Sequence, residues 1–110
     1  MLSSIITYYG SRWCKYYDLA YDSSYYYDHI TGTSQWDRPY DFDMSSRDES
    51  RWEQACITLL QFYRLYNPDR VRDLNDILVV YRDRYTELFL TLAEKYRVTD
   101  LSMFKGIDLD

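Results

Sequence analysis

The chain has few of the residues that build metal sites, disulfide networks and flexible loops. Its 110 residues include one histidine, two cysteines, two prolines and three glycines. Cys14 and Cys56 are far apart and have no companion Cys or His at metal-ligand spacing, so we expect two free thiols and no zinc site. The opening residues Met-Leu-Ser-Ser-Ile-Ile lack the basic region and long apolar run of a signal peptide. These absences predict an intracellular protein.

Clustered basic residues and long apolar runs are also missing. The net charge is −5, and acidic and basic residues are interspersed along the chain. A nucleic-acid-binding surface needs clustered Lys and Arg, and a membrane span needs about 20 apolar residues. We therefore expect a protein that binds neither nucleic acid nor membrane, in the cytoplasm or the nucleus.

The sequence also lacks the patterns of catalytic sites. It contains no Ser-His-Asp or Cys-His arrangement and no glycine-rich phosphate loop. Helix capping explains acidic pairs such as Asp73 and Asp76, and Cys56 lies on an apolar stripe typical of a buried thiol. We therefore predict no enzymatic activity, no catalytic residues, no cofactor and no metal.

Tyrosine is abundant, and it is concentrated near the N-terminus. Nine of the 14 tyrosines precede residue 43. Aromatic rings with polar tips suit surfaces that are half buried and half wet. Tyr-rich runs at 13–18 and 24–29 predict two strands. A hairpin loop at 19–23 joins them, and a tight turn around Gly32 leads to a short third strand at 34–36. Such short connections imply an antiparallel meander.

After residue 44 the apolar period becomes helical. Ser46 and Glu49 have the spacing of a capping box, which marks a helix start. Apolar residues then recur at spacings of four, three, four and three, at Trp52, Cys56, Leu59, Tyr63 and Tyr66. Pro68 disfavours helix in the residue before it, so this helix should end near Asn67.

A second helical stretch begins near Asp73. Its periodicity allows either one helix over about 74–97 or two helices with a break near Asp83, because Asp is a good N-cap. The segment NPDRVRDLNDILVVYRDRYTELFLTLAEKY is similar to a helical segment of large cytoskeletal and flagellar proteins of protists. In those proteins a glycine usually occupies the position of Asp83 and separates two helices, which favours the break. The resemblance also adds the cytoskeleton, the basal body and the flagellum to the expected locations. The resemblance implies no biochemical activity.

The N-terminal part carries a specific motif. Trp13 is followed after 22 residues by Trp36, and Pro39 comes three residues later; between them lies the block YYYDHITGTSQWDRP at 25–39. This pattern closely resembles the WW domain family over about residues 8–41. We therefore predict an α+β chain, with a three-stranded antiparallel WW sheet at 5–41 followed by a helical hairpin or three-helix unit at 46–104, packed close to it.

Strand residues alternate between faces, so Tyr25, Tyr27 and His29 should share one face while Tyr26 and Asp28 lie on the other. The resemblance assigns structural residues to the second face. They form a small buckle: Trp13, Tyr26 and Pro39.

The resemblance assigns ligand binding to the first face, through Tyr16, Tyr25, Tyr27, His29 and Trp36. In the family, Tyr25 and Trp36 form the main groove, where two parallel rings leave a slot for a proline ring. Tyr27 and His29 select the residue that flanks the prolines, and an aromatic Tyr16 widens the patch. A polyproline II ligand is already extended, so it loses little entropy on binding.

The sequence leaves the ligand class open. Tyr16 and Tyr27 resemble family members that bind Pro-Pro-Leu-Pro or longer proline runs, whereas His29 resembles members that bind Pro-Pro-x-Tyr. Phosphoserine-proline ligands are disfavoured, because the first loop carries Asp18 and Asp22 where that subclass has Arg and Ser.

Two departures from the family pattern predict a weakened sheet. The usual Leu-Pro before Trp13 is missing, so Ile6 or Tyr8 would cover that ring. Asp28 replaces the usual Asn and removes two amide donors that pin the turn. We expect the helical part to compensate, with the two parts unfolding as one unit joined through Phe42, Met44 and Trp52.

The resemblance implies a protein–protein interaction module that binds proline-rich segments of a partner protein. It would form the N-terminal part of an adaptor or scaffold. The alternative is a structural, non-binding WW sheet that packs on its own helices or on a constant neighbouring subunit.

Overall fold

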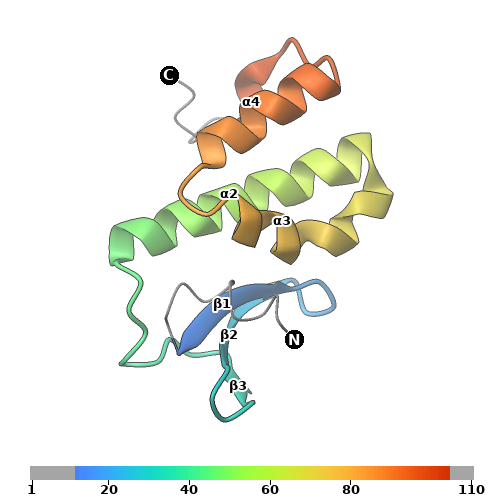
Figure 1. The fold of residues 1–110 in the computed structure, drawn as a ribbon. Helices are drawn as coiled ribbons and strands as arrows, with labels where there is room; N and C mark the ends of the chain where they lie inside the picture. The colour runs from blue at the N-terminus through green and yellow to red at the C-terminus, as the bar shows by residue number, and fades with distance from the viewer. Residues whose placement is uncertain (1–11, 105–110) are drawn as a thin grey trace. The chain divides into compact units, whose positions relative to one another are not determined.

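The computed structural model describes residues 12–104, and the chain divides into two compact units, Met1–Met44 and Ser45–Asp110 (Figure 1). The first unit holds a three-stranded antiparallel sheet in the order β1-β2-β3, formed by Trp13–Asp18, Ser23–Asp28 and Ser34–Gln35. The predicted meander is confirmed, although β3 ends one residue before Trp36. Ile6 and Tyr8, expected to cover Trp13, lie outside the described residues.

The strand register separates the two faces of the sheet as alternation predicts. Lys15 lies opposite Tyr26, and Tyr16 opposite Tyr25. Lys15 and Tyr26 are buried, whereas Tyr16 and Tyr25 are only partly covered. One face of β1 and β2 therefore forms a core, and the other is accessible.

The buried face packs around Trp13 and Tyr26, which form a core with Phe42 and the partly buried Met44. The ring of Phe42 meets that of Tyr26 edge-on at 5.0 Å. Pro39 is buried as well. Phe42 and Met44, which we expected to join the sheet to the helices, thus have a place in the core of the sheet's own unit.

The turn between β2 and β3 corrects our expectation for Asp28. Its side chain is 1% exposed, and its Oδ1 accepts hydrogen bonds from the backbone N–H groups of Ile30 and Thr31 at 2.9 and 3.3 Å. Its Oδ2 accepts two further bonds from Arg12. Asp28 therefore pins the turn as an acceptor, and the lost amide donors of Asn are not a defect here.

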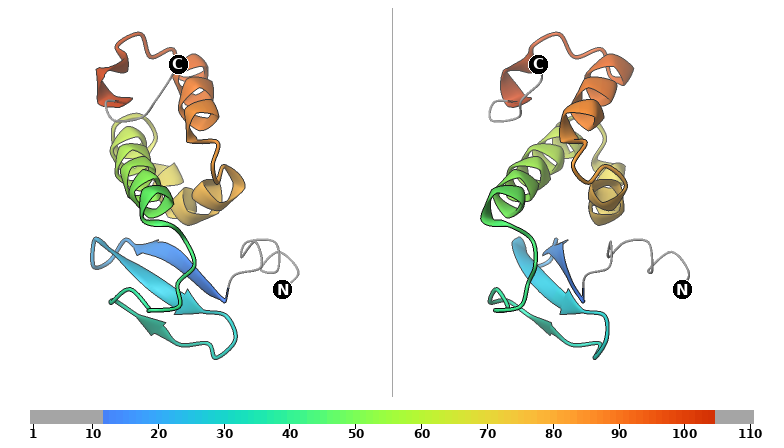
Figure 2. Two further views of the ribbon diagram at one scale, coloured as in Figure 1. Left: turned by 90° about the vertical axis from the view of Figure 1, so that its left-hand side faces the viewer. Right: turned by 60° about the vertical axis from the view of Figure 1, so that its left-hand side comes forward.

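Within residues 45–104, the second unit contains three α-helices: α2 at Ser46–Tyr66, α3 at Leu74–Val80 and α4 at Tyr85–Lys95 (Figure 2). Short 3₁₀ helices occupy Pro68–Asp73 and Leu101–Phe104. As predicted, α2 ends just before Asn67. The predicted capping box is wrong by one residue, because Ser45 is the N-cap and its hydroxyl accepts the Asp48 N–H at 3.0 Å. Two adjacent serines offer the same chemistry, and the chain uses the first.

The second helical stretch consists of two helices, α3 and α4, so the predicted alternative with a break near Asp83 is confirmed. Asp83 lies in the break with φ +63°, in the left-handed region that most residues avoid. The N-cap of α4 is Arg84, and it makes no side-chain cap bond. The proposed role of Asp83 as an N-cap is therefore wrong, and its backbone conformation makes the break instead.

The helical unit has its own aromatic core. Phe62 of α2 stacks on Phe104 at 6.0 Å, and Phe104 also meets Phe89 of α4 at 5.3 Å. All three rings are buried. Trp52, Cys56, Leu59 and Tyr63 of the predicted stripe are buried, but Tyr66 at its end is exposed. Within residues 12–104, no helix has the length and apolar character needed to cross a membrane.

Candidate functional site

The accessible face of the sheet carries a continuous series of aromatic rings, which we call the aromatic face. It consists of the five residues predicted to bind ligand: Tyr16, Tyr25, Tyr27, His29 and Trp36. The Tyr16 ring lies 5.9 Å from Tyr25 and 6.5 Å from Tyr27, and Tyr27 lies 4.6 Å from His29. The structure therefore brings all five residues together: the register of β1 and β2 places Tyr16 opposite Tyr25, and Trp36, after β3, contacts Tyr25.

One end of the aromatic face is formed by Tyr16, Tyr27 and His29. The hydroxyl of Tyr16 lies 3.3 Å from Nε2 of His29, within hydrogen-bonding distance. Burial among these rings lowers the pKa of His29 below its usual value and outweighs the opposite effect of the nearby Asp28 carboxylate. His29 is therefore neutral at pH 7, as suits a surface that binds apolar groups.

The other end is formed by Tyr25 and Trp36. Trp36 follows β3 and is 52% exposed, and its ring centroid lies 6.2 Å from that of Tyr25. The two ring planes meet at 75°, edge to face, so the parallel arrangement that we expected is wrong for this structure. Edge-to-face contact is a favourable geometry for two rings with nothing between them.

The desolvation of Tyr25 shows that this end is partly covered from water. Burial raises the pKa of the Tyr25 hydroxyl above its ordinary value, and the negative charge of Asp18 raises it further. Asp18 ends β1, so its carboxylate gives this edge of the aromatic face a negative potential.

Sequence reasoning missed one ring of this surface. Tyr21, in the loop between β1 and β2, lies 5.6 Å from Trp36 at an interplanar angle of 75°. Strand alternation does not reach into a loop, so it gave no reason to place Tyr21 on either face. The only available signal was the presence of a large aromatic residue at the tip of a short hairpin.

Cationic side chains cover the opposite face. The ammonium of Lys15 lies 5.1 Å from the centre of the Tyr26 ring and donates to its hydroxyl at 3.3 Å. Arg12 stacks over Trp13 at 5.6 Å, and Arg38 over Phe42 at 5.2 Å. These cation–π contacts use the faces of the core rings. The faces of the Trp13 and Tyr26 rings are therefore occupied by these cations.

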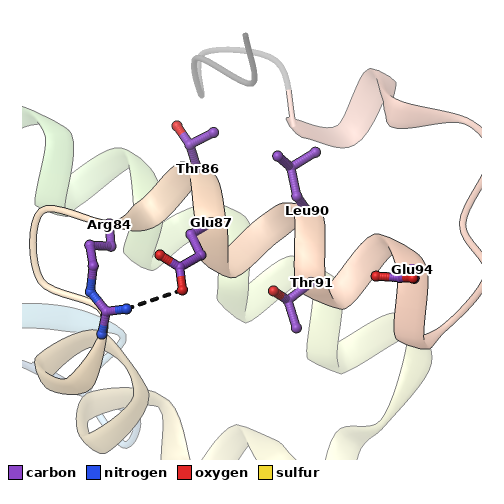
Figure 3. A pocket seen from close by; sticks show the side chains of 6 residues that line it. All are labelled: Arg84, Thr86, Glu87, Leu90, Thr91 and Glu94. Carbon is purple, nitrogen blue, oxygen red and sulfur yellow. Dashed lines mark hydrogen bonds and ion pairs between the residues drawn. The ribbon is translucent and has the colours of Figure 1, made fainter.

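Two open hollows lie on the described part of the helical unit. One of about 460 Å³ runs along α4, and its lining side chains include Arg84 and Glu87, which pair at 3.1 Å, and the exposed Leu90 (Figure 3). Another of about 320 Å³ is lined in part by Arg70 and Asp73, which pair at 3.2 Å. Across residues 12–104, no group of three or more His, Cys, Asp or Glu side chains could hold a metal ion. Neither hollow brings together aromatic rings as the aromatic face does, so the aromatic face is the candidate site considered further.

Comparison with known proteins identifies the family of the segment that carries the sheet. Residues 10–39 match the family model described as WW domain. The chain has no match among curated proteins or solved structures. The matched segment includes both Trp13 and Trp36, the aromatic block between them and Pro39. WW domains are protein-interaction modules rather than enzymes, and they generally bind proline-rich peptides. Residues 10–39 of this protein are a WW domain.

Proposed function

We propose that the aromatic face binds a proline-rich segment of a partner protein in the polyproline II conformation. The observation that carries the proposal is the pairing of Tyr25 with the half-exposed Trp36 at one end of a continuous row of rings. Aromatic grooves bind proline rings well, because the polyproline II helix is preformed and exposes its carbonyl groups to solvent. The module would serve in an intracellular adaptor or scaffold.

Ligand entry requires the Tyr25 and Trp36 rings to separate. Two apolar groups in contact are about 3.5–4.0 Å apart, so a proline ring held between two rings needs roughly 7–8 Å. The observed centroid distance is 6.2 Å at 75°. Rotation of the Trp36 ring would open the slot, and rotamer changes of this kind are common at interfaces. We propose that the ligand replaces the edge-to-face contact with a parallel clamp.

The end of the aromatic face formed by Tyr16, Tyr27 and His29 favours one of the two ligand classes, Pro-Pro-Leu-Pro or longer proline runs. The Nε2 atom of His29 faces the Tyr16 hydroxyl, and the imidazole lies edge-on to Tyr27. This engagement leaves His29 less able to select a ligand tyrosine than it would be alone. Tyr16 and Tyr27 instead extend a flat apolar surface next to Tyr25. We therefore propose that Pro-Pro-Leu-Pro or longer proline runs bind better than Pro-Pro-x-Tyr.

Titration of the full chain with short peptides tests both statements. Calorimetry with a Pro-Pro-Leu-Pro and a Pro-Pro-x-Tyr peptide should give dissociation constants on the order of ten to hundreds of micromolar, tighter for the first. NMR should then show shifted signals for Tyr16, Tyr25, Tyr27 and Trp36, while the α4 surface around Leu90 stays unchanged. A peptide with alanine in place of each proline is the control. A clear preference for Pro-Pro-x-Tyr would show that His29, rather than Tyr16 and Tyr27, determines the ligand class.

The edge-to-face contact of Tyr25 and Trp36 also favours a second candidate, a structural WW sheet that binds no peptide. In that case the two rings would remain in contact in the working protein. The same titration separates the candidates, because a structural sheet would show neither heat nor shifted signals with any proline-rich peptide at millimolar concentration.

A further inference from the structure

We infer that Tyr21 is a further ligand-contacting residue. It would extend the binding surface beyond Trp36, so the domain would bind a longer proline-rich segment. The inference rests on the proposed function, because it assigns an additional contact for the same ligand. Tyr21 is outside the five residues that the family pattern assigns to binding, and it comes from a loop rather than from a strand.

The position of Tyr21 indicates a role on the surface rather than in the core. Its side chain is 73% exposed, yet its ring lies 5.6 Å from the ring of Trp36. Trp36 therefore has an aromatic neighbour on the strand, Tyr25, and another on the loop. A ring that stabilised only the fold would be expected in the buried cluster of Trp13 and Tyr26.

The loop that carries Tyr21 is held in place by its own side chains. Oδ1 of Asp18 accepts hydrogen bonds from the backbone N–H groups of Ala20 and Tyr21, at 2.9 and 3.1 Å. The hydroxyl of Tyr17 donates to the carboxylate of Asp22, whose backbone takes the left-handed conformation with φ +54°. Because the backbone on both sides of Tyr21 is fixed, its ring is presented before a ligand arrives, which lowers the entropy cost of contact.

The spacing of the rings matches the repeat of the proposed ligand. A polyproline II helix rises about 3.1 Å per residue, so two residues span about 6.2 Å. The centroid distances from Tyr16 to Tyr25 and from Trp36 to Tyr21 are 5.9 and 5.6 Å. Each ring can therefore serve about two ligand residues. Tyr21 would add about two to the segment held by Tyr25 and Trp36.

The chemistry around Tyr21 defines which residues it would accept. Its ring offers an apolar face, which suits another proline. Asp18 ends β1 and Asp22 lies in the loop that follows it, and their carboxylates would repel an acidic or phosphorylated residue at this place. We therefore assign the added positions to uncharged residues, with proline preferred.

Three peptides test the inference on the full chain: a Pro-Pro-Leu-Pro core, the same core with two more prolines before it, and the core with two more prolines after it. Both extensions are needed, because a polyproline II segment can bind in either direction. One extended peptide should bind about two- to tenfold more tightly than the core, the range expected for one aromatic contact.

Variants of Tyr21 then identify the source of that gain. Tyr21→Ala should abolish the gain and leave the affinity for the core peptide within about twofold, while Tyr21→Phe should keep the gain because the ring is retained. Tyr40→Ala is the matched control, since Tyr40 is a tyrosine of the same unit that is 98% exposed. Circular dichroism checks that each variant is folded. In the wild-type chain, nuclear Overhauser contacts from ligand prolines to the Tyr21 ring give a second readout.

The possible results lead to distinct conclusions. Equal weakening of core and extended peptides by Tyr21→Ala would mean that Tyr21 only positions Trp36, and the inference would be rejected. It would also be rejected if neither extension improved binding to the wild-type chain, or if the gain survived Tyr21→Ala. A chain that bound none of the peptides would overturn the proposed function itself, and the inference with it.

Discussion

Arg12 and Asp28 form an ion pair that links the start of β1 to the turn after β2. Nε and Nη2 of Arg12 donate to Oδ2 of Asp28 at 2.8 and 2.6 Å, while Asp28 is buried and Arg12 is half exposed. The hydrogen bonds from Arg12 hold the pKa of Asp28 well below its usual range, and the N–H groups of Ile30 and Thr31 act in the same direction. A single carboxylate thereby fixes two segments that are 16 residues apart.

This ion pair predicts acid sensitivity of the sheet. Because Asp28 has a lower pKa in the folded than in the unfolded chain, where it is about 3.9, its contribution is complete above that value. The contribution is lost as the pH falls through the folded pKa. We expect the melting temperature of the sheet to drop between pH 5 and pH 2. Asp28→Asn should have a lower melting temperature at pH 7 and a flatter pH dependence.

Thermal melts followed by NMR signals of β1 and β2 would measure this effect. Asp43→Asn is the matched control, because Asp43 is an exposed carboxylate of the same unit. Equal pH dependence of the wild type and the Asp28→Asn variant would show that another group controls the acid transition.

The histidine of the aromatic face should titrate below its normal range. His29 is the only histidine in the chain, so its ring signals can be assigned without ambiguity. We expect its pKa to lie below 6.5 in the folded chain and to rise towards 6.5 in urea, since burial disfavours the charged form. Protonation would then destabilise the sheet as the pH falls through 6.5. A saturating proline-rich peptide should lower the pKa further by covering the ring. A folded pKa at or above the value in urea would contradict the desolvation that we describe.

The two tryptophans of the WW domain should respond differently to truncation. Trp13 is buried and its Nε1 donates to Asp41 at 2.9 Å, whereas Trp36 is half exposed. Truncation of a buried aromatic costs about 3–5 kcal/mol, which is a large part of the stability of a small domain. Trp13→Ala should therefore unfold the sheet, while Trp36→Ala should keep the fold and lose peptide binding. Circular dichroism and calorimetry measure the two effects. Loss of the fold in Trp36→Ala would contradict the assignment of faces.

The N-terminal unit should fold without the helices. Phe42 and Met44 complete its core, and Asp28 pins its turn, so the defect expected from Asp28 is absent. We expect a fragment of residues 1–44 to show a cooperative thermal transition and dispersed NMR signals. The full chain is the control for its melting temperature. A fragment without native signals would support the earlier expectation that the helices stabilise the sheet.

The sequence predicted those features that depend on local signals. The alternation of β2 separated Tyr25 and Tyr27 from the buried Tyr26, and the stop at Pro68 ended α2 at the right place. Both depend on backbone geometry, which short patterns determine well. The cap at Ser45 was missed by one residue, because neighbouring serines are equally good caps.

Features that depend on distant side chains were not predictable. Nothing in the residues near Asp28 indicates that Arg12 will pair with it. Likewise, alternation places Tyr25 near Trp36 but does not determine the angle between their rings, which also depends on Tyr21 from another loop. Rotation about side-chain bonds costs little, so such angles follow from packing rather than from sequence pattern.

The different surroundings of the three tryptophans have a practical consequence for optical work on this protein. Trp13 and Trp52 are 7% and 5% exposed, in separate units, and Trp36 is 52% exposed. A water-soluble quencher such as acrylamide will therefore act mainly on the emission of Trp36. Since Trp36 lies between Tyr21 and Tyr25, the quenchable part of the fluorescence reports on the candidate binding surface, without a label and without removal of the other two indoles.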